Sequence, residues 1–287
     1  MRDDFAVFIL THGRPDNVVT VETLKKAGYT GKWYIVIDDE DDSEQAYRDR
    51  YGDKVLQFSK SDVAAKTDSA DNSDDRRVIL YARNACFDLA KELGIQWFAE
   101  FDDDYDSMGH RYETEDGNYG LKQVPVKEAD KVFTAMIEFL EETGSDTIAM
   151  AQGGDFIGGT KSNVWKQGLA RKAMNTFIFN ADNPIRFMGR INEDVNFYTR
   201  HNNVGHKIFT IADVMINQLP SQSNAGGMTE MYLDTGTYTK SFYTIIYSPQ
   251  AVTIGTMGQT ARRLHHKVTW NKTAPKILNE RYRKEKS

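Results

Sequence analysis

The sequence has almost no cysteine and no long hydrophobic run. Its 287 residues include one cysteine, Cys86, which excludes an internal disulfide. A thiol inside a predicted helix is typical of a buried structural cysteine, not a catalytic one. No apolar stretch reaches the length of a membrane span, and the first four residues carry no signal-peptide pattern. We therefore expect a cytoplasmic protein with no membrane partner.

Repeats and low-complexity segments are also missing, which excludes a solenoid or a fibrous protein. The loop after the first predicted strand is not a glycine-rich phosphate loop, so a nucleotidyltransferase lacks its expected motif. With 40% hydrophobic residues, the chain is long enough to bury a full core.

The charge is unevenly distributed. The net charge is −6, but residues 261–287 carry nine Lys or Arg against two Asp or Glu, so this tail is +7 and the remainder is −13. A basic segment on an acidic body is suited to approach a polyanion such as nucleic acid. Such a tail is equally typical of a solvated extension, and charge alone slightly favours that interpretation.

Strand and helix patterns alternate along the chain. Strands are predicted at 5–10, 33–37, 54–58, 95–101, 147–151, 173–180 and 207–211, and helices at 18–27, 44–51, 81–93, 126–143 and from about 193. Asp16 or Asn17 is the expected cap of the first helix, and the polar residues 60–77 read as a mobile loop flanking a site. The alternation predicts an α/β fold with a mainly parallel, Rossmann-like sheet flanked by helices. Ligands of such sheets bind beyond the carboxyl ends of the strands.

Carboxylates follow two of these strands. Asp102, Asp103 and Asp104 end a buried strand, where a carboxylate needs a partner to offset its desolvation. One or two carboxylates together with a diphosphate are a usual site for Mg²⁺ or Mn²⁺, although Asp-x-Asp alone is a weak motif. The second acidic run, 38–44, fails the EF-hand pattern at positions 43 and 49. It reads as a solvated loop in which Asp38 or Asp39 is placed to accept a hydrogen bond from a base.

Four short blocks occur in order along the chain. They are Thr-His-Gly-Arg-Pro at 11–15, Asp-Asp at 38–39, Ala-Arg-Asn-Ala at 82–85 leading to the aspartates at 102–104, and Asn-Glu-Asp at 192–194. Their order resembles the inverting family 2 glycosyltransferases of the GT-A fold. More narrowly, the blocks at 8–15 and 98–105 resemble the TET-associated glycosyltransferases of bacteriophages, which add sugars to hydroxymethylated pyrimidines in DNA. The resemblance covers the first two thirds of the chain, and in a phage-encoded protein the cytoplasm would be the host's.

The resemblance implies a donor site for a UDP-sugar with Mn²⁺ or Mg²⁺. It places Asp104 and Asp102 at the metal, and a C-terminal loop would bring His265 or His266 to the same ion, although a histidine pair in a basic tail is more often a surface feature. The residues implied at the nucleotide sugar are Thr11, His12, Arg14, Asp38, Asp39, Arg83, Asp102 and Asp103.

The resemblance also implies a catalytic base. Asp194 would take the proton of the acceptor hydroxyl, Glu193 would orient the acceptor, and direct attack would invert the anomeric centre. Acidic residues at a helix N-terminus are favoured by the backbone dipole without any chemistry, so this pair also has a purely structural interpretation.

The implied acceptor is DNA that contains 5-hydroxymethylcytosine, whose phosphates would contact Lys161, Lys166, Arg171 and Lys172, near paired glycines at 153–159. A GT-A enzyme acting on a saccharide, lipid or protein remains open, as does a non-catalytic nucleotide- or DNA-binding module. We expect one glycosyltransferase domain over 1–287, with a nucleotide-sugar half at 1–105, an acceptor half at 106–215 and a C-terminal extension with the basic tail at 216–287.

Overall fold

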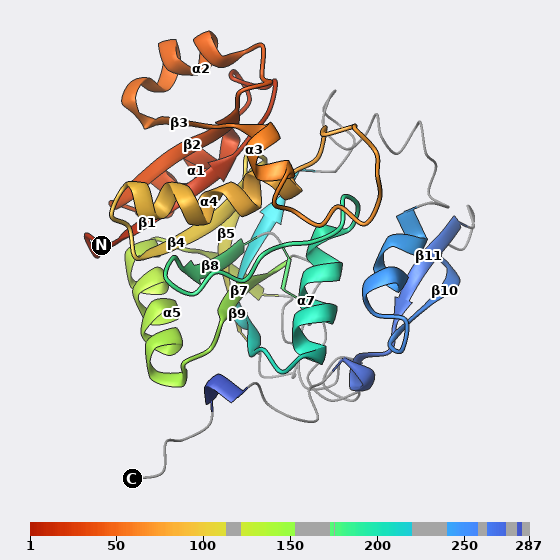
Figure 1. The fold of residues 1–287 in the computed structure, drawn as a ribbon. Coiled ribbons are helices and arrows are strands. Elements are labelled where there is room, and N and C mark those ends of the chain that lie inside the picture. The colour runs from red at the N-terminus through yellow and green to blue at the C-terminus, as the bar shows by residue number, and fades with distance from the viewer. Residues whose placement is uncertain are drawn as a thin grey trace.

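A computed structural model describes residues 1–112, 122–152, 173–174, 176–219, 240–257, 263–273 and 280–282. Within these ranges a nine-stranded sheet forms the centre of the molecule, and helices cover its two faces (Figure 1). A separate two-stranded sheet lies toward the C-terminal end of the chain. None of the described helices is both long and apolar enough to cross a membrane.

The strands of the large sheet are β1 Phe5–Leu10, β2 Lys32–Asp38, β3 Val55–Phe58, β4 Trp97–Asp102, β5 Tyr105–Tyr112, β6 Lys122–Pro125, β7 Thr147–Gln152, β8 Thr176–Asn180 and β9 Ile208–Gln218. The helices are α1 Val19–Lys26, α2 Glu44–Tyr51, α3 Lys60–Ala64, α4 Leu80–Glu92, α5 Ala129–Thr143 and α7 Glu193–Asn203. Residues 240–247 are also helical and precede the hairpin of β10 Val252–Met257 and β11 Arg263–Val268. Short 3-10 turns occupy Gly52–Lys54, Trp270–Lys272 and Glu280–Tyr282.

The sheet order is β3-β2-β1-β4-β8-β7-β9-β5-β6. The pairs β3–β2, β2–β1, β1–β4 and β7–β9 are parallel, whereas β8 and β5 run antiparallel to both of their neighbours. Every strand except β8 and β5 therefore points the same way. This arrangement confirms the predicted α/β fold with a mainly parallel sheet flanked by helices.

The core lies on both faces of the sheet, and β1 shows why. All six of its residues are buried, as a strand covered on two sides requires. Ala6, Phe8 and Leu10 join the cluster that contains α4 and α7 residues, while Phe5, Val7 and Ile9 join the cluster that contains α1 and α5 residues. The alternation follows from the two-residue period of a strand. It fixes β1, and the loop after it, in the middle of the molecule.

Three predictions of local structure were wrong. The N-cap of α1 is Val18, not Asp16 or Asn17, and the Asp16 carboxylate pairs with Arg50 instead at 2.8 Å. The polar segment 60–77 begins as helix α3, whose first residue, Lys60, is buried. The strands β5, β6 and β11 were not predicted because charged residues interrupt their apolar pattern, and β10, whose sequence has no charged residue, was also not predicted.

Candidate active site

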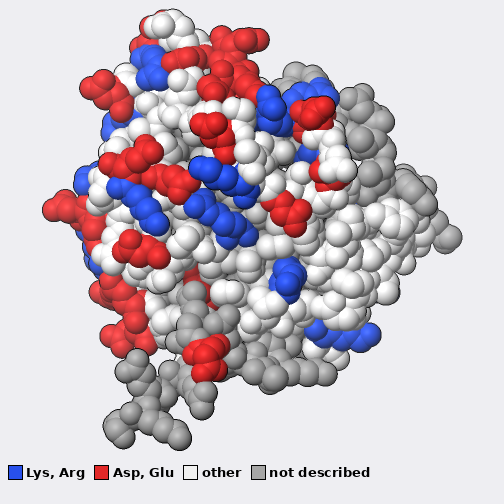
Figure 2. Space-filling view, viewed as in Figure 1, with Lys and Arg blue, Asp and Glu red and all other residues white. Residues whose placement is uncertain are grey.

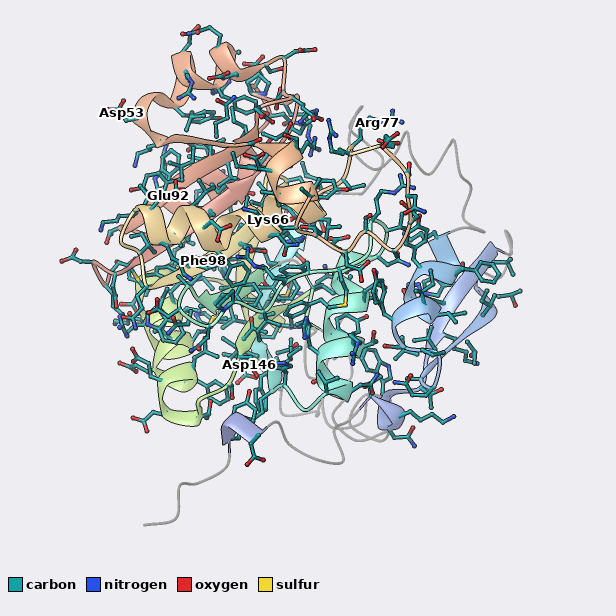
Figure 3. The ribbon with its side chains drawn as sticks, in the orientation of Figure 1. Asp53, Lys66, Arg77, Glu92, Phe98 and Asp146 are labelled. Carbon is teal, nitrogen blue, oxygen red and sulfur yellow. The ribbon has the colours of Figure 1, made fainter. Side chains whose placement is uncertain are left out.

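The carboxyl ends of β2, β1 and β4 lie side by side in the sheet. Leu10 pairs with Val36 on one side and with Asp102 on the other, so the loops that follow these strands leave the same edge together. This register brings the predicted blocks at 11–15, 38–39 and 102–104 into one neighbourhood. The side chains of this part of the molecule are drawn in Figure 3, in which Phe98 of β4 marks the core.

Asp103 fastens the loop after β1 to the end of β4. Its Oδ2 accepts hydrogen bonds from Thr11 Oγ1 at 2.6 Å and pairs with Arg14 Nε at 3.2 Å, and Tyr47 Oη lies 2.9 Å from the same threonine hydroxyl. Asp103 is only 2% exposed, and burial outweighs these partners and raises its pKa to about 6. In the structure, Asp103 therefore contacts both Thr11 and Arg14. Their predicted contact with a nucleotide stays a prediction.

Asp38 at the end of β2 sits between two basic groups. Its Oδ2 lies 3.0 Å from His12 Nδ1 and 3.1 Å from Lys60 Nζ. Burial would raise the pKa of this carboxyl, but the bond from His12 and the charge of Lys60 outweigh burial and hold the pKa below its ordinary value. Asp39 is exposed, and its Oδ1 accepts a bond from the Lys60 backbone N–H at 2.9 Å. Asp38 is therefore an ionised group facing the loop that carries His12.

Asp104, like Glu100, has one buried carboxylate oxygen without a hydrogen-bond partner among the described atoms. Its Oδ2 accepts a bond from Gln218 Nε2 at 3.1 Å, but its Oδ1 is buried and has no hydrogen-bond partner among the described atoms. Burial, followed by the charges of Asp102 and Asp103, raises the pKa of Asp104 to about 7. A buried carboxylate oxygen without a donor is unfavourable unless a cation pairs with it. The donor set therefore fits a hard divalent cation.

The end of β4 is held from below by helix α1. Thr20 Oγ1 donates to the Asp102 carbonyl at 2.6 Å and accepts from the Tyr105 N–H at 3.0 Å, while the Thr20 N–H donates to the Asp103 carbonyl at 3.1 Å. Thr20 is fully buried. One residue of α1 thus fixes the turn in which Asp104 lies.

Arg83 connects the two halves of the site. Its guanidinium is buried and donates to Asp102 Oδ1 at 3.1 Å, Glu193 Oε1 at 3.3 Å and Glu100 Oε2 at 3.4 Å. The ring centroids of Phe177 and Phe187 each lie 5.5 Å from Arg83 Cζ. Arg83 was predicted at the nucleotide, and that contact stays a prediction; in the structure its donors serve three carboxylates.

Glu100 is a site residue that the sequence argument missed. It is fully buried on β4, and burial raises its pKa to about 8 despite the neighbouring Arg83. A single carboxylate inside the apolar strand 97–101 was the available sign, because an unpaired charge is costly in a core. Asn84, next to Arg83, belongs to the block at 82–85, but the sequence predicted no role for its side chain. Its side chain holds the backbone of Phe187 through bonds of 2.8 and 3.0 Å.

Glu193 and Asp194 form the first turn of α7, as predicted. Glu193 is 9% exposed, and burial together with the charge of Asp194 raises its pKa above the ordinary value. Asp194 is partly exposed, and its Oδ1 accepts a bond from the Val195 N–H at 2.8 Å. The Arg83 guanidinium lies between Glu193 and Asp102 and donates to both carboxylates. The base role of Asp194 and the orienting role of Glu193 stay predictions.

His265 and His266 lie on β11, with ring centroids 4.2 Å apart. His266 Nδ1 is 3.4 Å from Asn192 Nδ2, so the pair lies beside the start of α7. Within the described ranges, His, Cys, Asp and Glu form no group of three that fits a metal ion. The structure therefore does not gather these histidines with Asp102 and Asp104, and their ligation of metal stays a prediction.

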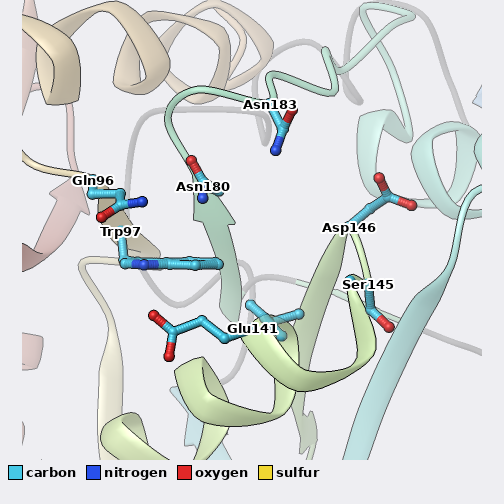
Figure 4. Close-up of a pocket in the computed structure, with 9 residues that line it drawn as sticks. Gln96, Trp97, Glu141, Ser145, Asp146, Asn180 and Asn183 are labelled. Atoms are coloured by element: carbon cyan, nitrogen blue, oxygen red, sulfur yellow. The ribbon is translucent and has the colours of Figure 1, made fainter. Parts of the chain in front are cut away.

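A cavity of about 320 Å³ lies at the opposite edge of the sheet (Figure 4). It is lined by Trp97 at the amino end of β4 and by Glu141, Asp146 and Asn180, among others. Asp102 lies at the other end of β4, so this cavity is separate from the predicted site. Asp146, labelled below the centre of Figure 3, marks that opposite edge.

The predicted DNA contacts Lys161, Lys166, Arg171 and Lys172, and the glycines at 153–159, lie outside the described residues. On the described part of the face in Figure 2, basic side chains lie among acidic ones and form no continuous stripe. Acidic side chains gather there around α2. The described face therefore adds no support for a phosphate-binding surface.

The fold and the site define an α/β protein whose carboxylates and basic groups converge beyond the carboxyl ends of parallel strands. Residues 5–227 match the model of the TET-Associated Glycosyltransferase family, and the chain belongs to this family. The family resemblance and the enzyme class predicted from the sequence are thereby confirmed. No curated protein matches the chain.

The chain is also similar to solved structures. The crystal structure of S. aureus TarS 1-349 is 15% identical with a TM-score of 0.39, over 74% of this chain, and the chain spans 59% of that structure. Glucosyl-3-phosphoglycerate synthase from Mycobacterium tuberculosis, in complex with Mn²⁺, UDP and phosphoglyceric acid, is 8% identical with a TM-score of 0.47, over 92% of this chain and 86% of that one. The same enzyme with Mg²⁺ and UDP gives 8% and 0.46, over 92% and 87%. Likenesses of this strength assign no role to a residue.

Proposed function

We propose that the protein transfers a sugar from a UDP-sugar to the hydroxymethyl group of 5-hydroxymethylcytosine in DNA, with Mn²⁺ or Mg²⁺ as its cofactor. The observation that carries the proposal is the buried, unpaired Oδ1 of Asp104 beside Asp102, at the carboxyl end of a parallel strand. The chain's membership of a glycosyltransferase family gives this site its chemical context.

Asp104 and Asp102 are the residues that would hold the ion. A divalent cation there would neutralise the charge that develops on the departing diphosphate. Two carboxylates are enough for such a site, because a sugar nucleotide brings phosphate oxygens as further ligands. His265 and His266 remain candidates for an additional ligand, since both lie on the hairpin beside α7.

The loops beside the aspartates are proposed to bind the nucleotide. Asp38 is held ionised by His12 and Lys60, and Asp39 is exposed next to it, so either carboxylate is suited to accept a bond from a base N–H. Arg14 is partly exposed and lies on the loop after β1, within reach of an anion at the same edge. Thr11 and Asp103 would support this loop from inside.

Asp194 is the proposed general base. It is partly exposed at the start of α7, whereas Glu193 is buried against Arg83, so Asp194 is the member of the pair that an acceptor can reach. Loss of the hydroxyl proton to Asp194 would accompany attack of the hydroxyl oxygen on the anomeric carbon as the bond to the diphosphate breaks. This single displacement would invert the anomeric centre.

DNA is the acceptor that the family description and the basic tail support. A modified base must leave the stack before its hydroxymethyl group can enter an active site. A saccharide, lipid or protein acceptor would keep the same donor chemistry. A non-catalytic nucleotide- or DNA-binding module would show neither transfer nor metal-dependent hydrolysis of the donor.

The test is incubation of the protein with UDP-glucose or UDP-N-acetylglucosamine, Mn²⁺ and DNA containing 5-hydroxymethylcytosine, followed by mass spectrometry of the digested nucleosides. The proposal predicts a gain of one sugar on the modified nucleoside, absent with Asp104→Ala and retained with Asp106→Ala, a change at an exposed residue two positions away. Metal-dependent release of UDP without a DNA product would move the search to another acceptor. If no UDP is released with any donor, the proposal that the protein transfers sugar from a UDP-sugar is contradicted.

A further inference from the structure

Three distant segments meet beside the start of α7. They are the loop after α3 at 67–71, the segment 187–192, and the helical residues 240–247. Figure 1 shows the loop after α3 reaching past the start of α7 toward the C-terminal part of the chain.

Asp71 lies at the centre of this junction. Its Oδ2 accepts bonds from Arg190 Nη2 at 2.9 Å and Nε at 3.1 Å, and from the Tyr243 hydroxyl. Arg190 Nη2 also donates to Tyr243 Oη at 3.2 Å. Arg190 and Tyr243 are each 6% exposed, so the carboxylate neutralises a guanidinium that is nearly out of water. One side chain thereby binds both of the other segments.

The backbone reinforces the junction. The Gly189 N–H donates to the Asp68 carbonyl at 2.8 Å, and the Arg190 N–H donates to the Ser69 carbonyl at 3.0 Å. Gly189 has a φ of +81°, and a Cβ there would lie 2.2 Å from Asn196 Nδ2, so only glycine fits. Ala70 adopts a φ of +71°, which costs roughly 1 kcal/mol for a residue with a Cβ. The loop keeps this conformation because its neighbours are bonded on both sides.

The junction leads directly to the proposed base. Asn192 follows Arg190 by two residues and has a left-handed backbone with φ of +58°, after which α7 begins with Glu193 and Asp194. Its Nδ2 donates to the Lys240 carbonyl at 2.9 Å and lies 3.3 Å from Thr244 Oγ1. The turn that carries the base is therefore held by the loop after α3 on one side and by 240–247 on the other.

We propose that Asp71 is a positioning residue for the transfer reaction: by binding Arg190 and Tyr243 together, it fixes the turn that presents Asp194 to the acceptor. This assignment rests on the proposed function. Asp71 acts through Arg190 and touches neither donor nor acceptor. The same assignment means that residues 240–247, which belong to the predicted C-terminal extension, help to hold the turn before α7 in place.

The test compares Asp71→Ala, Asp71→Asn and the control Asp74→Ala, an exposed carboxylate of the same loop. Because an offset of about 1 Å at the reacting group can lower a rate by roughly 100-fold, we expect Asp71→Ala to lower kcat for transfer by roughly 10- to 100-fold. KM for the UDP-sugar should change by less than about twofold, since the metal and nucleotide residues lie on other loops. Asp71→Asn keeps an acceptor oxygen and should recover part of kcat, and Asp74→Ala should match the wild type.

A double variant separates positioning from general damage to the fold. If Asp71 acts through Asp194, Asp71→Ala should cost little further activity when added to Asp194→Asn, because residues that act as one unit are not additive. Full additivity, unchanged kcat in Asp71→Ala, or a parallel loss of UDP binding would overturn the assignment. An active wild type with unaffected Asp71→Ala leaves the proposed function standing. A wild type that transfers no sugar overturns the proposed function and this assignment with it.

Discussion

The two acidic regions of the site are held in different ways. Asp38 ends β2, Asp103 and Asp104 follow β4, and their partners include Arg14 after β1, Lys60 of α3 and Gln218 at the end of β9. Glu193 and Asp194 begin a helix whose approach is fixed by segments more than 100 residues earlier and about 50 residues later. The proposed donor side takes its geometry from the sheet, whereas the proposed base side takes it from loops. We infer that a substitution on one side should leave the other side intact, except at Arg83, which bonds to both sides.

The sharpest test of this difference is Asp194→Asn. The change removes the proposed base while leaving the donor side intact, so kcat for transfer should fall by roughly 10²- to 10⁴-fold. Affinity for UDP with Mn²⁺ should stay within about twofold of the wild type, because the change lies outside the metal and nucleotide residues. Single-turnover transfer and equilibrium titration of UDP would measure the two quantities. Equal loss of both would mean that the two regions are not separable.

Replacing the link should damage both regions. Arg83→Met leaves Glu100, Asp102 and Glu193 without their common cation, and breaking a buried ion pair on one side costs roughly 3–5 kcal/mol of unfolding free energy. Urea denaturation at pH 7 measures this cost. Glu100→Gln is the matched control, since it keeps Arg83 and nearly the shape of the buried side chain while removing only one of the three carboxylates, and it should cost less than Arg83→Met. A stable Arg83→Met protein would contradict the role of Arg83 as the link.

A smaller effect should be confined to the donor side. Thr20→Val keeps the shape of a fully buried side chain but leaves the Asp102 carbonyl and the Tyr105 N–H without their partner. An unsatisfied buried group costs about 1–3 kcal/mol. We expect that loss in urea denaturation, with weaker binding of UDP and Mn²⁺. Thr23→Val, at another buried threonine of α1, is the control, and equal effects of the two changes would count against a specific role for Thr20.

The smallest effect concerns pH. The hydrogen bond that His12 donates to Asp38 raises the pKa of His12, so the folded protein holds this proton more tightly than the unfolded chain does. The resulting stability is present below the ordinary histidine pKa of about 6.5 and is lost as pH rises through the raised value. Because His12 is partly exposed, His12→Gln should cost well under about 1 kcal/mol at pH 5.5 and less at pH 8.5. A cost that grows with pH would reverse the predicted sign.

The sheet and the donor side were largely predictable from sequence. Continuous apolar runs predicted β1, β2 and β4, and each run stops where its polar loop begins, so the edge that carries 11–15, 38–39 and 102–104 followed from the strand period alone. The helix start at Glu193 was equally visible in the sequence. The pattern could not predict which residue bonds to each carboxylate, for example that the Thr11 hydroxyl donates to Asp103.

The base side was not predictable in the same way. The contact of Asp71 with Arg190 joins residues separated by 119 positions, and no periodicity relates a loop to the approach of a distant helix. The left-handed backbone of Ala70 is likewise imposed by the contacts of its neighbours, because alanine disfavours this conformation, whereas asparagine, as at Asn192, adopts it more readily. Only the family resemblance pointed to Asp194, and it said nothing of the loop that positions it.

The most direct test of the donor site is titration of Mn²⁺ in the presence of UDP, followed by electron paramagnetic resonance. The wild type and Asp194→Asn should each bind one Mn²⁺ per chain more tightly with UDP than without it, and Asp104→Asn should lose this binding while keeping the wild-type circular dichroism spectrum. Binding of Mn²⁺ by Asp104→Asn with wild-type affinity would contradict the assignment of the metal to the end of β4.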